Sequence, residues 1–226
     1  MTARIAVLAS GGGSNLQAIL DHFAALADRA PGRVVLVASD RPNALALERG
    51  RRAGATAIAL NEAARTAGLR DLLEAHAITH VALAGYLRQV PADVTTAWHG
   101  RMLNVHPALL PAFGGKGMYG HRVHEAVVAC GVRVTGATVH FVDDQYDHGA
   151  VIAQWPVPVF PGDTAATVAV RVLEVEHQLF PPVVAAVAAG RITLDASGRV
   201  TGLRTPMLFA HFAASDASGA ADAAPW

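Results

Sequence analysis

Asn104 and His106 stand two residues apart at the end of a short apolar run, Met102 and Leu103. If this run is a strand, both polar side chains point to the same face, because side chains alternate along a strand. Pro107 would then end the strand, since proline cannot donate to the ladder. An amide that donates to a developing oxyanion, beside a group that carries a proton, suits attack on a carbonyl. The alternative interpretation is a polar cluster that stabilises a turn.

An acidic segment runs from Asp143 to His148 and follows a second strand-like run. Asp147 precedes a turn, where its carboxylate can reach an imidazole, favour the imidazolium and fix its orientation. The alternative is an Asp-rich turn that hydrogen-bonds its own backbone. A calcium loop does not fit, because the sixth position from Asp143 is His148 rather than Gly and the twelfth is Gln154 rather than Glu.

A glycine-rich turn, SGGGSN, occupies residues 10–15 after the strand-like residues 5–9. Its glycines let the backbone approach a ligand, Ser14 or Asn15 can cap the helix that follows, and a helix N-terminus favours an anion. The turn lacks the Lys-Ser/Thr pair of a P-loop. It also carries Leu16 at the last glycine position of the dinucleotide-binding pattern. The turn therefore indicates an anion site without specifying the ligand.

Apolar runs alternate with helical patterns along the first half of the chain. We expect strands at residues 5–9, 34–38, 57–60 and 81–84, and helices at residues 16–27, 44–53, 69–76 and 91–98. This alternation predicts an α/β fold whose mostly parallel sheet has helices on both faces. Ligands bind beyond the carboxyl ends of such strands. Residues 10–15, 85–88 and 104–111 all lie at such ends, which predicts one shared cleft.

The pattern changes after residue 111. A glycine-rich loop at residues 113–120 is interpreted as a lid. A helix is expected next, at residues 121–130, and strands at 136–142 and 151–157 flank the acidic segment, so the later sheet is expected to be partly antiparallel. The last expected elements are a long helix at 164–189, kinked near Pro181 and Pro182, and an edge strand at 192–194. We expect one domain over residues 1–212 and a mobile Ala/Ser/Asp-rich tail over 213–226.

These segments together resemble the folate-dependent phosphoribosylglycinamide formyltransferases (GAR transformylases) of purine synthesis. The resemblance covers about residues 4–195. It is carried in order by VLASGGGSNLQ (7–17), ALAGYLR (82–88), LNVHPALLP (103–111), GGKGMYG (114–120), HFVDDQYDHGAVIAQ (140–154) and Glu176-His177. Formyltransferases in general share the Asn-x-His-Pro-x-Leu-Leu-Pro signature with a downstream Asp-x-Gly. The Gly-Ser-Asn opening and the chain length narrow the choice to the glycinamide enzyme.

The resemblance implies a Rossmann-like formyltransferase fold that transfers a formyl group from the co-substrate 10-formyltetrahydrofolate to the amine of phosphoribosyl glycinamide. It implies that Asn104 donates to the formyl oxygen as this becomes an oxyanion. His106 would be the general acid or proton shuttle, and Asp147 would raise the pKa of His106 and orient it.

The resemblance also implies binding residues. Those for the substrate's phosphate and ribose are Gly13, Ser14, Asn15, Glu176 and His177. Those for the folate are Arg65, Leu87, Arg88, Gln89 and Val90, together with Asn104. Gly12 stands where the family's loop often has Asn, which leaves the backbone cradle intact.

The composition and net charge limit which kinds of binding partner are expected. With 52% hydrophobic and 16% charged residues the chain is expected to fold, and a net charge of zero gives no electrostatic case for nucleic acid or a membrane surface. No stretch approaches the ~18 apolar residues of a membrane span. The lone cysteine, Cys130, fits a reducing cytosol and is expected to be buried against its helix's neighbours. We expect small-molecule partners, no metal and a cytoplasmic location, with the histidines mostly at the surface and at caps; the oligomeric state is left open.

Other formyl enzymes of the same fold are the nearest alternatives. A methionyl-tRNA formyltransferase is expected to carry a further C-terminal domain and a formyltetrahydrofolate hydrolase a further N-terminal domain. Neither domain is expected here. The phosphate loop argues against a sugar-nucleotide formyltransferase only moderately. A non-catalytic phosphate-binding module would explain the glycine turn, but it gives no reason for Asn104, His106 and Asp147 to occur together.

Overall fold

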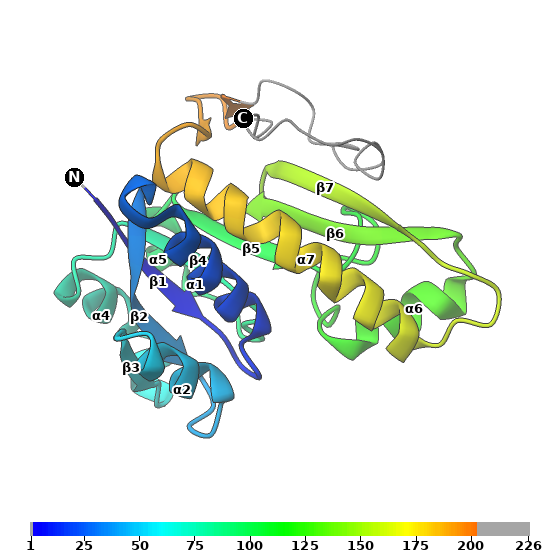
Figure 1. Ribbon diagram of the computed structural model, residues 1–226, viewed down its shortest axis with the longest axis horizontal. Coiled ribbons are helices and arrows are strands. Elements are labelled where there is room, and N and C mark those ends of the chain that lie inside the picture. The colour runs from blue at the N-terminus through cyan, green and yellow to red at the C-terminus, as the bar shows by residue number, and fades with distance from the viewer. Residues whose placement is uncertain (1, 203–226) are drawn as a thin grey trace.

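A seven-stranded sheet forms the centre of the computed structural model, which describes residues 2–202 (Figure 1). In spatial order the strands are β3 (Thr56–Ala59), β2 (Gly32–Ser39), β1 (Ala3–Leu8), β4 (His80–Leu83), β5 (Met102–His106), β6 (Val134–Phe141) and β7 (Val151–Pro158). The first five strands run parallel, whereas β6 pairs antiparallel with β5 and β7 with β6. The expected α/β fold with partly antiparallel later strands is confirmed.

Helices cover both faces of the sheet, because side chains alternate along each strand and bury two separate cores. In β1, Ile5 and Val7 belong to one core, and Ala6 and Leu8 to the other. The first core is covered by α1 (Ser14–Leu26), α2 (Leu45–Arg52), α6 (His121–Cys130) and α7 (Ala165–Ala188), and the second mainly by α4 (Leu69–Ala75) and α5 (Ala92–Ala97). The helices α1 and α7 lie side by side on the near face of Figure 1. The remaining helical segments of the described residues are two short turns, η1 (Ala27–Arg29) and α3 (Glu62–Arg65).

The expected edge strand at residues 192–194 does not join the main sheet. It forms β8 (Thr193–Leu194), which pairs antiparallel with β9 (Val200–Thr201) in a separate two-stranded sheet. The reason is the turn between them, in which the Asp195 carboxylate accepts hydrogen bonds from the backbone N–H groups of Ser197 and Arg199. This local turn brings residues 200–201 beside β8.

The helix α7 agrees closely with the expected residues 164–189. Thr164 caps its first turn, and Pro181 and Pro182 lie inside the helix without ending it. Cys130 is exposed, which corrects the expectation that it is buried. It is the last residue of α6, and Gly131 turns the chain immediately afterwards with φ 70°.

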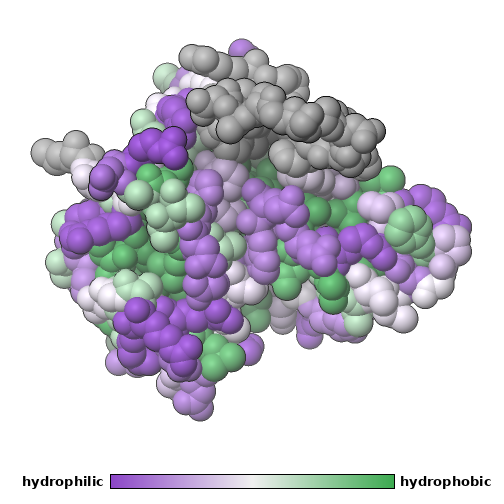
Figure 2. All heavy atoms as spheres, in the orientation of Figure 1, coloured by the Kyte–Doolittle hydropathy of each residue, from purple (hydrophilic) through white to green (hydrophobic). Residues whose placement is uncertain are grey.

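The expected domain end at residue 212 and the tail at residues 213–226 lie outside the described residues. Between residues 2 and 202, no helix combines the length and the apolar character needed to cross a membrane. Hydrophilic and hydrophobic residues are interspersed on the face drawn in Figure 2.

Candidate active site

Asn104 and His106 lie on β5, as the sequence predicts. Asn104 is half-buried in the middle of the strand, and His106 is its last residue and only 2% exposed. Asn104 is in register with Leu83 of β4 and with His140 of β6, and His106 is in register with Thr138 of β6. Their positions are therefore fixed by the centre of the sheet rather than by a loop.

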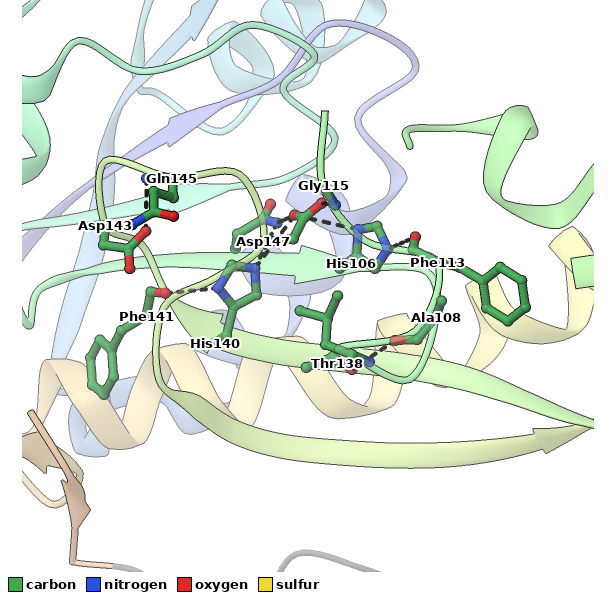
Figure 3. A network of polar contacts seen from close by, with 12 residues as sticks. His106, Ala108, Phe113, Gly115, Thr138, His140, Phe141, Asp143, Gln145 and Asp147 are labelled. Atoms are coloured by element: carbon green, nitrogen blue, oxygen red, sulfur yellow. Dashed lines mark hydrogen bonds and ion pairs between the residues drawn. The ribbon is translucent and has the colours of Figure 1, made fainter. Parts of the chain in front are cut away.

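The segment between β6 and β7 carries Asp147 to His106 (Figure 3). Asp147 Oδ1 lies 3.5 Å from His106 Nδ1 and accepts a hydrogen bond of 3.5 Å from Asn104 Nδ2. Its other oxygen, Oδ2, accepts a hydrogen bond of 2.9 Å from the backbone N–H of Gly115. Asp147 has φ 53°, a left-handed conformation that Asp tolerates better than most residues and that is common at functional sites. The structure thus brings the three expected catalytic residues together.

His140 is a fourth member of this cluster, and the sequence reasoning missed it. It is 2% exposed, and its Nε2 lies 3.1 Å from Asn104 Nδ2 and 3.8 Å from Asp147 Oδ1. Its Nδ1 lies 2.7 Å from the carbonyl oxygen of Phe141, which can only accept, so Nδ1 carries the proton of the neutral ring. His140 Nε2 is then free to accept from the Asn104 amide and to orient it. The available signal was the cross-strand pairing of His140 with Asn104.

The protonation of His106 follows from its surroundings. Its Nε2 donates to the carbonyl oxygen of Phe113 at 2.8 Å, so Nδ1, facing Asp147, is the nitrogen that gains or loses a proton. Burial lowers the pKa of His106 below its ordinary value, while Asp147 and the Phe113 carbonyl raise it in part. Asp147 is expected from the sequence to raise the pKa of His106, and its contribution has that direction. The net pKa of His106 is nevertheless lowered, because desolvation outweighs the carboxylate.

The glycine-rich loop at residues 113–120 lies against the same cluster. Phe113 contacts His106 and Gly115 contacts Asp147 through their backbones, as described above, and Phe113 itself has φ 56°. The loop also lines the cavity in front of the cluster. Its position is that of the expected lid; its motion stays a prediction.

A cavity of about 360 Å³ opens in front of Asn104, His106, His140 and Asp147. The expected folate-binding stretch, Leu87 to Val90, lines the same cavity. Two hydrogen bonds fix this stretch. The backbone N–H of Leu87 donates to Ser10 Oγ at 2.9 Å, and Arg88 Nε donates to the buried carboxylate of Asp40 at 3.2 Å. The expected shared cleft is therefore present for the folate stretch and the catalytic cluster.

Arg65, the remaining expected folate residue, does not line this cavity. It ends α3 and pairs with Glu62, one turn earlier, and its Nε is buried without a hydrogen-bond partner. Its role toward the folate stays a prediction.

The glycine turn meets α7 at the start of α1. Ser14 begins α1, and the capping position is Gly13, so neither Ser14 nor Asn15 caps the helix as the sequence suggested. Asn15 lies inside the first turn and faces α7, where its Nδ2 donates to Glu176 Oε2 at 2.6 Å. The first N–H groups of α1 therefore have no side-chain cap, which keeps the helix N-terminus suited to an external anion.

Glu176 and its neighbours carry unsatisfied polar atoms. Glu176 is 7% exposed, and burial raises its pKa to about 7, while the hydrogen bond from Asn15 opposes this rise. Asn15 Oδ1 and His177 Nε2 are buried without hydrogen-bond partners, and burial lowers the pKa of His177. Buried polar atoms rarely lack partners, and a polar ligand would satisfy these. The five expected phosphate and ribose residues do not line the 360 Å³ cavity.

Two histidines outside the expected catalytic residues do not occupy the surface positions expected from the sequence. His140 and His124 are both buried, and burial lowers the pKa of His124 to about 4. Among residues 2–202, no group of three or more His, Cys, Asp or Glu side chains is arranged to hold a metal ion.

Comparison with known proteins agrees with this fold and site. Residues 3–184 match the family model described as Formyl transferase. The chloroplastic phosphoribosylglycinamide formyltransferase of Arabidopsis thaliana is 40% identical over 196 residues, which cover 84% of this chain and 66% of the plant protein. The phosphoribosylglycinamide formyltransferase of Escherichia coli (strain K12) is 39% identical over 196 residues, covering 84% of this chain and 89% of that protein.

A solved structure is similar over most of its length. The crystal structure of glycinamide ribonucleotide transformylase 1 from Symbiobacterium toebii has a TM-score of 0.79 and 42% identity, and the match covers 88% of this chain and 93% of that one. The chain belongs to the formyl transferase family. It spans only 66% and 64% of the length of its relatives from Arabidopsis thaliana and Vigna unguiculata.

Proposed function

We propose that this chain transfers the formyl group of 10-formyltetrahydrofolate to the amine of N1-(5-phosphoribosyl)glycinamide. The products are formylglycinamide ribonucleotide and tetrahydrofolate, and the reaction belongs to purine biosynthesis. The names of the relatives from Arabidopsis thaliana and Escherichia coli support this substrate. A cytoplasmic location stays a prediction.

One observation carries the proposal. Asn104, His106 and Asp147 meet in the cavity that the Leu87–Val90 stretch also lines. Asn104 Nδ2 and His106 Nδ1 each lie 3.5 Å from the same oxygen, Asp147 Oδ1. A formyl group placed beside this oxygen therefore meets an amide donor and an imidazole at once, which is the geometry that carbonyl attack requires.

The proposed reaction begins when the substrate amine attacks the formyl carbon. A new C–N bond forms, the formyl oxygen becomes an oxyanion, and Asn104 Nδ2 donates to it. His140 holds the Asn104 amide in place through the contact between His140 Nε2 and Asn104 Nδ2. The bond between the formyl carbon and the folate nitrogen then breaks, which restores the carbonyl.

Protons must move in the same steps. The attacking amine loses one proton and the leaving folate nitrogen gains one, so no net proton is consumed between these two atoms. His106 mediates this exchange at Nδ1, since the Phe113 carbonyl holds Nε2. Asp147 stabilises the imidazolium that forms during the exchange.

The phosphate of the glycinamide substrate is assigned to Gly13, Ser14 and Asn15 at the N-terminus of α1. Glu176 and His177 are assigned to the ribose and its surroundings, because the buried unpaired atoms Asn15 Oδ1 and His177 Nε2 lie in this region. Ser10 links the two regions, since its backbone N–H donates to Gly85 and its hydroxyl accepts from Leu87.

The test is an assay of the purified chain with 10-formyltetrahydrofolate and phosphoribosyl glycinamide, following both loss of the donor and formation of the formylated amine. Asn104→Ala should lower turnover by roughly 10²–10³, the typical effect of losing an oxyanion donor. His106→Ala should also lower turnover, and the double variant should fall far short of the product of the two losses.

The assay without the amine is the control. Equal donor loss with and without phosphoribosyl glycinamide would identify a hydrolase rather than a transferase. Failure of the folate to bind, measured by calorimetry with a folate analogue, would instead favour a phosphate-binding module.

A further inference from the structure

The glycine turn is held from behind by α2. The backbone N–H of Ala46 donates to the carbonyl oxygen of Gly11 at 3.2 Å, and Arg49 Nε donates to the carbonyl oxygen of Gly12 at 2.9 Å. The contact is close, since a Cβ on Gly13 would lie 2.8 Å from Ala46 Cα, and Gly13 has φ 71°. Two successive carbonyl groups of the turn therefore point at the same helix.

This arrangement fixes the direction of the N–H groups. The peptide bonds that follow Gly11 and Gly12 are trans, so each carbonyl and the next N–H point in opposite directions. The N–H groups of Gly12 and Gly13 thus point away from α2. Neither has a hydrogen-bond partner within residues 2–202. They are oriented outward beside the first turn of α1, which is the arrangement that cradles an anion.

Within residues 2–202, Arg49 supplies the side-chain hydrogen bond to the carbonyl groups of this turn. It is half-buried, and besides Gly12 it contacts Gln17 of α1, whose Oε1 accepts from Arg49 Nη1 at 2.9 Å. Gln17 in turn donates to Asp21 at 2.8 Å. One guanidinium group therefore ties the turn to α1 and α2 and adds a positive charge behind the N–H groups.

We propose that Arg49 is a positioning residue for the substrate's phosphate. It holds the Gly12 carbonyl so that the Gly13 N–H faces the anion, without touching the anion itself. This inference rests on the proposed function, because it takes the glycine turn as the phosphate site. It predicts a defect confined to the phosphorylated substrate.

The first test compares kinetic constants of Arg49→Met with those of the wild type. A hydrogen bond to a charged group contributes enough to expect a roughly tenfold rise in KM for phosphoribosyl glycinamide. The KM for the folate and kcat should change less than twofold. Arg49→Lys keeps the charge and can still donate to Gly12, but it loses the planar fork that also reaches Gln17, so it should lie between Arg49→Met and the wild type.

Arg52→Met is the matched control. Arg52 lies on the same helix, is exposed and pairs with Glu48, so it does not contact the turn. Its removal should leave both KM values unchanged. A rise in both KM values of Arg49→Met, or equal effects of Arg49→Met and Arg52→Met, would overturn the assignment.

Titration with ribose 5-phosphate, followed through the backbone amide NMR signals, separates this inference from the proposed function. In the wild type the Gly12 and Gly13 signals should shift and saturate, and in Arg49→Met the midpoint should move to higher concentration. Absence of any shift in the wild type would remove the turn's proposed phosphate role. Equal midpoints in both proteins would overturn the role of Arg49 and leave the phosphate role of the turn intact. If Arg49→Met is unstable, the same comparison is made with Arg49→Lys.

Discussion

Asp147 controls the charge beside His106. Its carboxylate raises the pKa of a ring whose burial lowers it, so removing the charge should lower the pKa of His106 further. Asp147→Asn keeps the size, and Asn tolerates the left-handed backbone at this position. NMR titration of the His106 ring in both proteins measures the change. Asp143→Asn is the control, because Asp143 pairs with His148 and should leave His106 unaffected. A His106 pKa that stays constant or rises in Asp147→Asn would contradict the role of Asp147.

Glu176 is a buried carboxyl whose charge opposes folding. Its pKa is about 7 in the folded chain, above its ordinary value, so its contribution to stability is present in acid and is lost as the pH rises through about 7. Glu176→Gln is neutral at every pH and keeps a hydrogen-bond acceptor for Asn15. The gain in thermal midpoint from Glu176→Gln should therefore be larger at pH 8 than at pH 6. Glu174→Gln, exposed on the same helix, should show no such trend. A gain that does not depend on pH would disprove the buried charge.

At the scale of elements, α7 depends on its first turn. The Thr164 hydroxyl accepts from the Thr167 N–H, and the Thr167 hydroxyl accepts from the Thr164 N–H. Thr164→Ala should lower the free energy of unfolding by about 1 kcal/mol, the typical cost of losing such a cap. Denaturant titration measures it, with Thr96→Ala, exposed within α5, as the control. A loss of activity larger than the loss of folded protein would show that the cap also positions Glu176.

The elements were largely predictable because their signals are local. The apolar runs of β1, β2 and β4 and the helical patterns between them identify parallel βαβ units from the sequence alone. The pairing of β8 with β9 was not predictable in this way. It depends on the Asp195 turn and on two residues at 200–201, which are too few to give a periodic pattern.

For the whole molecule, the histidines whose pKa is lowered by burial or partial burial predict loss of stability in acid. Burial lowers the pKa of His80 and His124 to about 4, and it also lowers those of His106 and His140. Unfolded histidine titrates near 6.5, so between pH 6.5 and about 4 the unfolded chain binds more protons and stability falls as the pH falls. Glu176 acts in the opposite direction, but the histidines outnumber it.

Thermal unfolding at pH 7 and pH 5 measures this dependence. The midpoint should be lower at pH 5, and the difference should shrink in His124→Gln, which removes one buried ring that titrates. His99→Gln, exposed just after α5, is the control. Equal midpoints at the two pH values would contradict the neutral state of the buried rings.

The residues of the candidate site were predictable only where they lie in short, recognisable sequence motifs. Asn104 and His106 share one strand, and Asp147 stands in a recognisable acidic segment. His140 gains its position from antiparallel register with Asn104, which depends on how two strands pair. The hydrogen bond between Asn15 and Glu176 likewise depends on α1 packing against α7, and only the family resemblance suggested Glu176.

The same hydrogen bond has a consequence for how the chain reaches its native state. Asn15 and Glu176 are 161 positions apart, so they meet only after most of the chain between them has been organised. Contacts of such long range form against a large loop-closure entropy and favour slow folding. We therefore expect partly folded chains to hold much of their helix and strand content while lacking the proposed substrate site. During refolding, recovery of activity should lag behind recovery of secondary structure.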